Sequence, residues 1–127
     1  DLHRLDGQAY KTEKGAFRNH PCTIWANACL ENTWWLLAHG LALCNEYEHR
    51  YGKSHSCKNT LIEATTIIPL ATDLWHDAPS SFVFAGFDQF KYDTSIDVFT
   101  KYKRYIASKP WVATNYLRDP SRKPDWI

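Results

Sequence analysis

Apolar and polar residues recur with a helical period along much of this chain, and the longest such pattern runs from Leu30 to Tyr51. At about 100° per residue its apolar side chains share one broad face, which we expect to be buried. That face holds Leu30, Trp34, Leu36, Leu37, Gly40, Leu41, Cys44, Tyr47 and Tyr51. Gly52 follows as the expected C-cap.

The opposite side of this helix is polar except for one large indole. It carries Asn32, Trp35, His39, Ala42, Glu46, His49, Arg50 and Lys53. A polar face usually meets water, so Trp35 indicates that something covers this side: another part of the chain, a partner or a ligand. If the chain itself is the cover, Asn32, Glu46 and Arg50 line an internal cleft.

Shorter patterns predict three more helices. Pro21 is typical of a first helical position, so a helix should start after His20 and pause near Cys29. A third helix is expected after Ser54 or Ser56, through 61–65, ending at Pro69.

The fourth helix is expected to begin at Asp93 and Thr94 and to stop at Pro110. Its inner stripe would be Ile96, Phe99, Tyr102 and Ile106, and Asp97 would pair with Lys101 on its outer side. Between Pro69 and Asp93 we expect a long loop rich in aromatic residues, and after Pro110 an extended tail anchored by aromatic side chains.

Together these patterns predict an all-α fold: a compact single-domain bundle of about four helices. A length of 127 residues suits one domain, and 44% hydrophobic with 23% charged residues is typical of a globular protein. No apolar run is long enough to span a bilayer, so we expect a cytoplasmic protein with no membrane partner. The chain begins with Asp1 and contains no Met, so we expect that it was either processed or cut from a longer protein.

The net charge of +1 hides an uneven distribution. Residues 21–90 carry three bases and seven acids, whereas residues 91–127 carry eight bases and four acids. The segment 91–127 therefore presents either a basic surface for phosphates or an ordinary solvated exterior.

The spacing of the cysteines and histidines argues against disulfide bonds and against a metal site. Cys22 and Cys29 on one helix would stand roughly 10 Å apart along its axis, too far for a disulfide. We expect four reduced, mostly buried thiols. There is no CxxC, HExxH or HxH motif, and we expect neither a metal nor another cofactor.

Two residues are candidate catalytic groups. His20 at a helix N-terminus would stay neutral and can exchange a proton with a substrate, or it can simply cap the helix. Glu46 lies one turn before Arg50, which suits either a general acid or base or a plain ion pair.

The segment 50–55, with sequence RYGKSH, places cations around a glycine turn. It is a candidate phosphate-binding loop, although cations are also favoured at a helix C-terminus for stability alone. The candidate binding residues are Asn32, Trp35, Arg50, Lys53, His55, Lys101 and Arg104.

Several short motifs resemble those of small uncharacterised proteins of phages and marine bacteria: HPC, NxxWL, LCNEY, RYGKxH, FDQF, KYKRY and a closing PxW. HPC, Trp25 and the segment from LCNEY to RYGK also resemble pyrimidine-dimer DNA glycosylases, small helical base-excision enzymes. That resemblance implies an amine that attacks the sugar of a damaged nucleotide, assisted by an acidic residue, on DNA opened at the lesion. No residue here matches the amine, and only the scaffold around His20, Trp25, Glu46 and Arg50 is shared.

Three hypotheses follow. The first is a phage or bacterial protein that acts on nucleic acid, in DNA repair or nucleotide metabolism, with DNA as partner. The second is a non-enzymatic interaction module or homodimer, with Trp35 and the aromatic loop as its interface. The third is a small-molecule hydrolase or transferase that uses His20 and Glu46.

Overall fold

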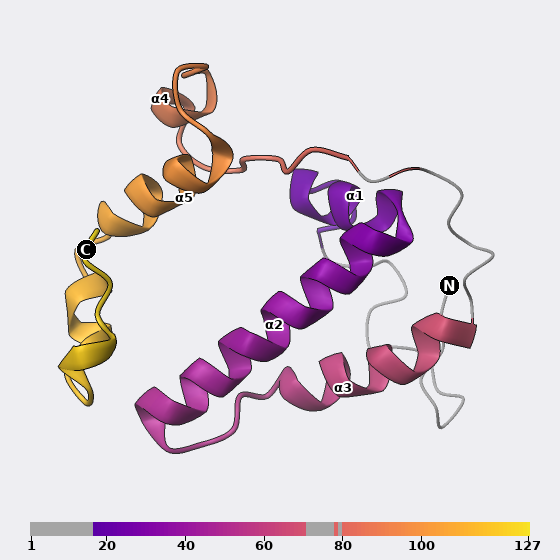
Figure 1. The fold of residues 1–127 in the computed structure, drawn as a ribbon, viewed down its shortest axis with the longest axis horizontal. Helices are drawn as coiled ribbons and strands as arrows, with labels where there is room; N and C mark the ends of the chain where they lie inside the picture. Colours follow the sequence, from indigo (N-terminus) through magenta and orange to yellow (C-terminus); the bar gives the residue numbers. More distant parts are fainter. Residues whose placement is uncertain (1–16, 71–77, 79) are drawn as a thin grey trace.

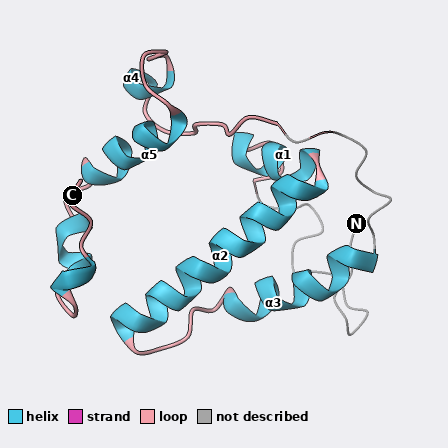
Figure 2. Cartoon of the chain, in the orientation of Figure 1, coloured by secondary structure: helices cyan, strands magenta, loops and turns pink. Residues whose placement is uncertain are grey.

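The computed structural model describes residues 17–70, 78 and 80–127. These residues form helices and turns without any strand, which confirms the predicted all-α class (Figure 2). The α-helices are α1 (Pro21–Ala28), α2 (Leu30–Tyr51), α3 (Lys58–Ile67), α4 (Asp88–Lys91) and α5 (Val98–Ala107). Two 3-10 helices follow, η2 (Val112–Tyr116) and η3 (Pro120–Arg122).

A single extended residue, Cys29, separates α1 from α2 and confirms the predicted pause. Its φ is −148° and its ψ 164°, and its Sγ accepts a hydrogen bond from the Asn32 amide at 3.4 Å. A thiol thus occupies the capping position that Ser or Asp usually takes. α1 packs against the N-terminal end of α2 (Figure 1).

The C-terminal end of α2 also lies where the sequence predicts it. Gly52 adopts φ +66° and caps the helix through its N–H to the Glu48 carbonyl, as predicted. α3 then lies beside α2 (Figure 1) and ends at Ile67, ahead of Pro69. The predicted serine caps are wrong, because Cys57 is the N-cap of α3 and both serines lie in the turn before it.

The apolar face of α2 is only partly buried, which corrects the prediction. Leu37 and Cys44 are buried, but Trp34, Leu36 and Tyr51 are between 37% and 45% exposed. With about 1.5 Å of rise per residue, the 22 residues of α2 span about 33 Å and the 10 residues of α3 only about 15 Å. α3 is too short to cover the whole face.

Asn32, which the pattern places on the polar side of α2, is buried and only 4% exposed, as expected where another part of the chain covers that side. Its Nδ2 donates to the Trp25 carbonyl at 2.8 Å and to Ser80 Oγ at 3.0 Å. α1 packs on this side of α2, which removes the amide from water. Trp35 is covered only in part: the ring of Phe82 lies 4.8 Å from it, but the residue is still 40% exposed.

α5 begins later than predicted. Its N-cap is Asp97, whose carboxylate accepts from the amides of Phe99 and Thr100 at 2.9 and 3.0 Å. Asp93 instead accepts from the Ser95 amide within a turn. Both aspartates are suitable N-cap residues, and Asp97, which directly precedes the helix, is the one that caps it.

The tail after Pro110 is anchored to the rest of the protein, as predicted, but its backbone is not extended. The segment lies against the C-terminal end of α2 (Figure 1) and buries Val112 and Tyr116, while its backbone forms η2 and η3. None of the helices in the described part of the chain combines the length and apolarity needed to cross a bilayer.

Candidate functional site

A carboxylate between two guanidinium groups lies where α2 meets the C-terminal segment. Glu46 Oε1 accepts from Arg50 Nε at 2.7 Å, and Glu46 Oε2 accepts from Arg122 Nε at 3.0 Å and from Arg122 Nη2. These hydrogen bonds, from Arg122 first and then Arg50, lower the pKa of Glu46 to about 2. Glu46 is therefore an anion throughout the neutral range.

Further contacts hold the same two segments together, and we call residues 115–122 the C-terminal clasp. The Arg50 guanidinium lies 4.3 Å from the ring centre of buried Tyr116, a cation–π contact. His49 Nε2 lies 2.8 Å from Asp119 Oδ2, and the Tyr51 hydroxyl donates to Asn115 at 3.2 Å. The clasp therefore covers the last turns of α2.

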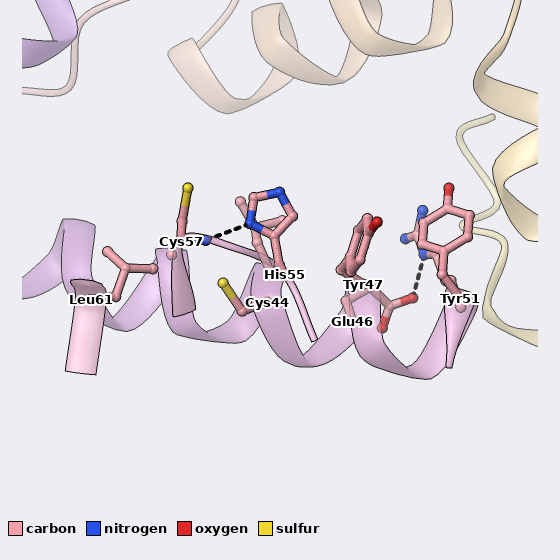
Figure 3. Close-up of a pocket in the computed structure, with 10 residues that line it drawn as sticks. Cys44, Glu46, Tyr47, Tyr51, His55, Cys57 and Leu61 are labelled. Atoms are coloured by element: carbon pink, nitrogen blue, oxygen red, sulfur yellow. Dashed lines mark hydrogen bonds and ion pairs between the residues drawn. The ribbon is translucent and has the colours of Figure 1, made fainter. Parts of the chain in front are cut away.

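A cavity of about 430 Å³ lies beside this cluster, between α2 and the start of α3. Glu46 and Tyr51 lie at one end, Cys57 and Leu61 at the other, and His55 between them (Figure 3). His55 Nδ1 accepts a hydrogen bond from the Cys57 amide at 3.2 Å. Only its Nε2 is left to hydrogen-bond a ligand.

A second cavity, of about 370 Å³, lies between α1, α2 and α5 and has aromatic walls. The rings of Trp25 and Phe82 stack at 4.9 Å, and those of Trp35 and His39 at 4.8 Å. Trp35 is 40% exposed, so one face of this aromatic group remains open to solvent. Aromatic faces of this kind can hold a planar ligand.

Tyr102 closes one side of the aromatic cavity. Its hydroxyl donates to the Val83 carbonyl at 3.0 Å and accepts from the Ala85 amide at 3.2 Å. Burial, followed by a hydrogen bond with the Cys22 thiol at 3.5 Å, raises the pKa of Tyr102 to about 12. The hydroxyl stays protonated and fixes the segment around 82–85 to α5.

His20 and Glu46, the predicted catalytic pair, lie apart. His20 caps α1, where its Nδ1 accepts from the Cys22 amide at 3.2 Å. α1 packs on the N-terminal end of α2, whereas Glu46 belongs to its C-terminal half (Figure 1). These two side chains and buried Asn32 do not share one concavity.

The predicted binding residues divide in the same way. Arg50 and His55 line the cavity beside Glu46, and Lys53 is exposed immediately after Gly52. Lys101 and Arg104 lie on α5, where Lys101 Nζ donates to the Lys91 carbonyl at 3.1 Å, next to α4. Trp35 lines the aromatic cavity.

Sequence reasoning missed the distant partners of these residues. Arg122 and Tyr116 join the Glu46 cluster, Ser80 binds Asn32, and Phe82 lines the aromatic cavity beside Trp35. The excess of bases after residue 90 was the only signal for Arg122. No local pattern links it to a residue 76 positions earlier.

The thiols and possible metal ligands are scattered. All four cysteines are free; Cys29 and Cys44 are buried, Cys22 is half-buried and Cys57 is exposed. Among the residues described by the structure, His, Cys, Asp and Glu nowhere gather in a group of three that suits a metal ion.

Comparison with known proteins gives one match. The family model of pyrimidine dimer DNA glycosylases matches residues 2–59, fewer than half of the chain. In the described part this range contains α1, α2 and the start of α3, and it ends before α5 and the C-terminal clasp. The match agrees with the resemblance carried by HPC, Trp25 and the segment from LCNEY to RYGK. No curated protein and no solved structure matches the chain.

Proposed function

We propose that this protein binds DNA and takes part in DNA repair. The observation that carries the proposal is the similarity of residues 2–59 to pyrimidine dimer DNA glycosylases. This range includes five of the predicted binding residues, and three of them, Arg50, Lys53 and His55, lie at or just after the C-terminal end of α2. Cations on one surface suit the phosphates of a DNA backbone.

The aromatic cavity suits a second kind of contact with nucleic acid. Trp35 is half-exposed on its rim, about 24 Å along α2 from Tyr51 at 1.5 Å per residue, and Lys53 follows two residues after Tyr51. An exposed indole can stack on an unpaired base, and DNA is opened at a lesion. Lys101 and Arg104 on α5 would provide a second set of phosphate contacts.

The candidate catalytic residues enter the proposal with different roles. Glu46 is ionised at neutral pH, which suits the stabilisation of a positive charge better than the donation of a proton. His20 keeps Nε2 for a substrate, because Nδ1 is used by the helix cap. We further propose that these two residues take part in the excision of a damaged base.

The experiment is a fluorescence anisotropy titration of a labelled duplex, with and without a single cyclobutane pyrimidine dimer. We expect binding at about 50 mM salt that weakens steeply by about 200 mM, as for proteins that contact phosphates. A tighter complex with the damaged duplex would support the repair role. No binding at low salt would refute the proposal.

A second candidate is a non-enzymatic interaction module, such as a homodimer. The exposed apolar side chains on α2 and α5 favour it, among them Leu36, Leu43 and Phe99. Sizeable exposed apolar patches often mark protein interfaces. Sedimentation velocity would show a dimer whose dissociation is promoted by Leu43→Glu, and a monomer at every concentration would contradict this candidate.

A further inference from the structure

The residue after α2, Gly52, lies directly against an arginine from the far end of the chain. A Cβ placed on Gly52 would lie 2.6 Å from Arg118 Nη1 and 3.3 Å from Arg118 Cζ. Only a residue without a side chain lets the guanidinium approach the backbone this closely. Arg118 therefore covers the C-terminal end of α2, next to exposed Lys53.

The cations around this point divide into paired and unpaired groups. Glu46 binds both Arg50 and Arg122, and Glu48 binds Lys58 at 2.8 Å. In the described parts of the chain, by contrast, no carboxylate pairs with Arg118, Lys53 or Lys123. The acids Glu46, Glu48 and Asp119, on α2 and in the C-terminal clasp, are each paired with another residue.

We propose that Arg118 and Lys53 form a phosphate-binding surface that contacts the DNA backbone, an inference that rests on the proposed function. The carbonyl end of a helix repels anions, so a phosphate can approach the end of α2 only if a positively charged side chain lies between the two. Arg118 lies at this position, and its planar guanidinium can bind a phosphate through two hydrogen bonds.

The C-terminal clasp positions this surface against α2. Its contacts with Glu46, His49 and Arg50 hold the backbone on either side of Arg118 against α2. The guanidinium is thus placed before DNA arrives, which reduces the conformational entropy lost on binding. The surface joins Lys53, from the range that matches the glycosylases, to a segment outside that range.

The test compares Arg118→Gln and Arg118→Lys by anisotropy titrations with undamaged duplex across a series of salt concentrations. Lys103→Gln is the matched control, because it removes one positive charge from an exposed position on α5 outside the proposed surface. We expect Arg118→Gln to reduce the slope of log affinity against log salt by about 0.9, the value for one lost phosphate contact in B-DNA. Arg118→Lys should keep the slope, and Lys103→Gln should leave both slope and affinity unchanged.

A helix-stabilising role for Arg118 gives a different result. Such a role would lower the melting temperature of Arg118→Gln without altering the salt slope, and that outcome overturns the inference. Lys53→Gln provides a second, independent variant with the same expected loss of slope. If wild-type protein binds DNA but Arg118→Gln and Lys53→Gln both match Lys103→Gln, the surface is refuted and the proposed function stands. If wild-type protein does not bind, both are refuted.

Discussion

Replacing Glu46 with Gln should release much of the C-terminal clasp while leaving the helix intact. Gln keeps the volume of Glu46 but removes the charge that holds Arg50 and Arg122. The lowering of the pKa of Glu46 from 4.5 to about 2 corresponds to about 3 kcal/mol of stability, at about 1.36 kcal/mol per pKa unit. The Arg122 side chain is 48% exposed, so solvent screens part of this and we expect a loss of about 1 to 2 kcal/mol.

The loss should depend on pH with a definite sign. The pKa of Glu46 is lower in the folded protein than in the unfolded chain, so its contribution is fully present above about pH 4.5 and disappears as the pH falls to about 2. The stability difference between wild type and Glu46→Gln should therefore be constant from pH 7 to pH 5. At about pH 3 it should fall to less than half.

The assay is urea denaturation followed by tryptophan fluorescence at these three pH values. Glu48→Gln is the matched control, since Glu48 is two residues away and pairs with Lys58 at the surface. The control should lose less than about 1 kcal/mol. An equal loss in both variants, or a Glu46→Gln difference that persists unchanged at pH 3, would refute the assignment of Glu46 as the centre of the clasp.

Two further substitutions test contacts outside the clasp. Asn32→Ala should lower the free energy of unfolding by about 1 to 3 kcal/mol, because the Trp25 carbonyl loses its buried hydrogen-bond donor. The control Asn27→Ala, at an exposed position of α1, should lower it little. Equal losses in urea denaturation would contradict this prediction. Tyr102→Phe should lower the free energy of unfolding by about 1 to 2 kcal/mol and speed hydrogen exchange of the Ala85 amide, which donates to the Tyr102 hydroxyl. The control Tyr105→Phe keeps its ring contacts and should have neither effect. Unchanged exchange of this amide in Tyr102→Phe would contradict the prediction.

The sequence was sufficient wherever the determinants are local. α2 runs from Leu30 to Tyr51 as its period indicates, and Gly52 ends it because its positive φ strongly favours glycine. The pair of Glu46 with Arg50 follows from their spacing of four residues. Each of these features depends on residues within a turn or two of one another.

The sequence was insufficient wherever packing between distant segments decides. Asn32 looks like a surface residue in its pattern, and only the fold of α1 onto α2 buries it. Asp93 and Asp97 are equally good caps by type, so the start of α5 could not be chosen from the residues alone. The partners of Glu46 include a residue 76 positions away, which no periodicity reveals.

The separation of these contacting residues also bears on how the chain folds and opens. The hydrogen bonds between α1 and α2 close over seven positions, whereas those that hold the clasp close over 64 to 76. Long loops cost more entropy to close and their contacts form late. The clasp should therefore assemble after α1 has packed on α2 and detach before α1 does in transient partial unfolding, so that Glu46 and Arg50 meet solvent while α1 and α2 remain folded.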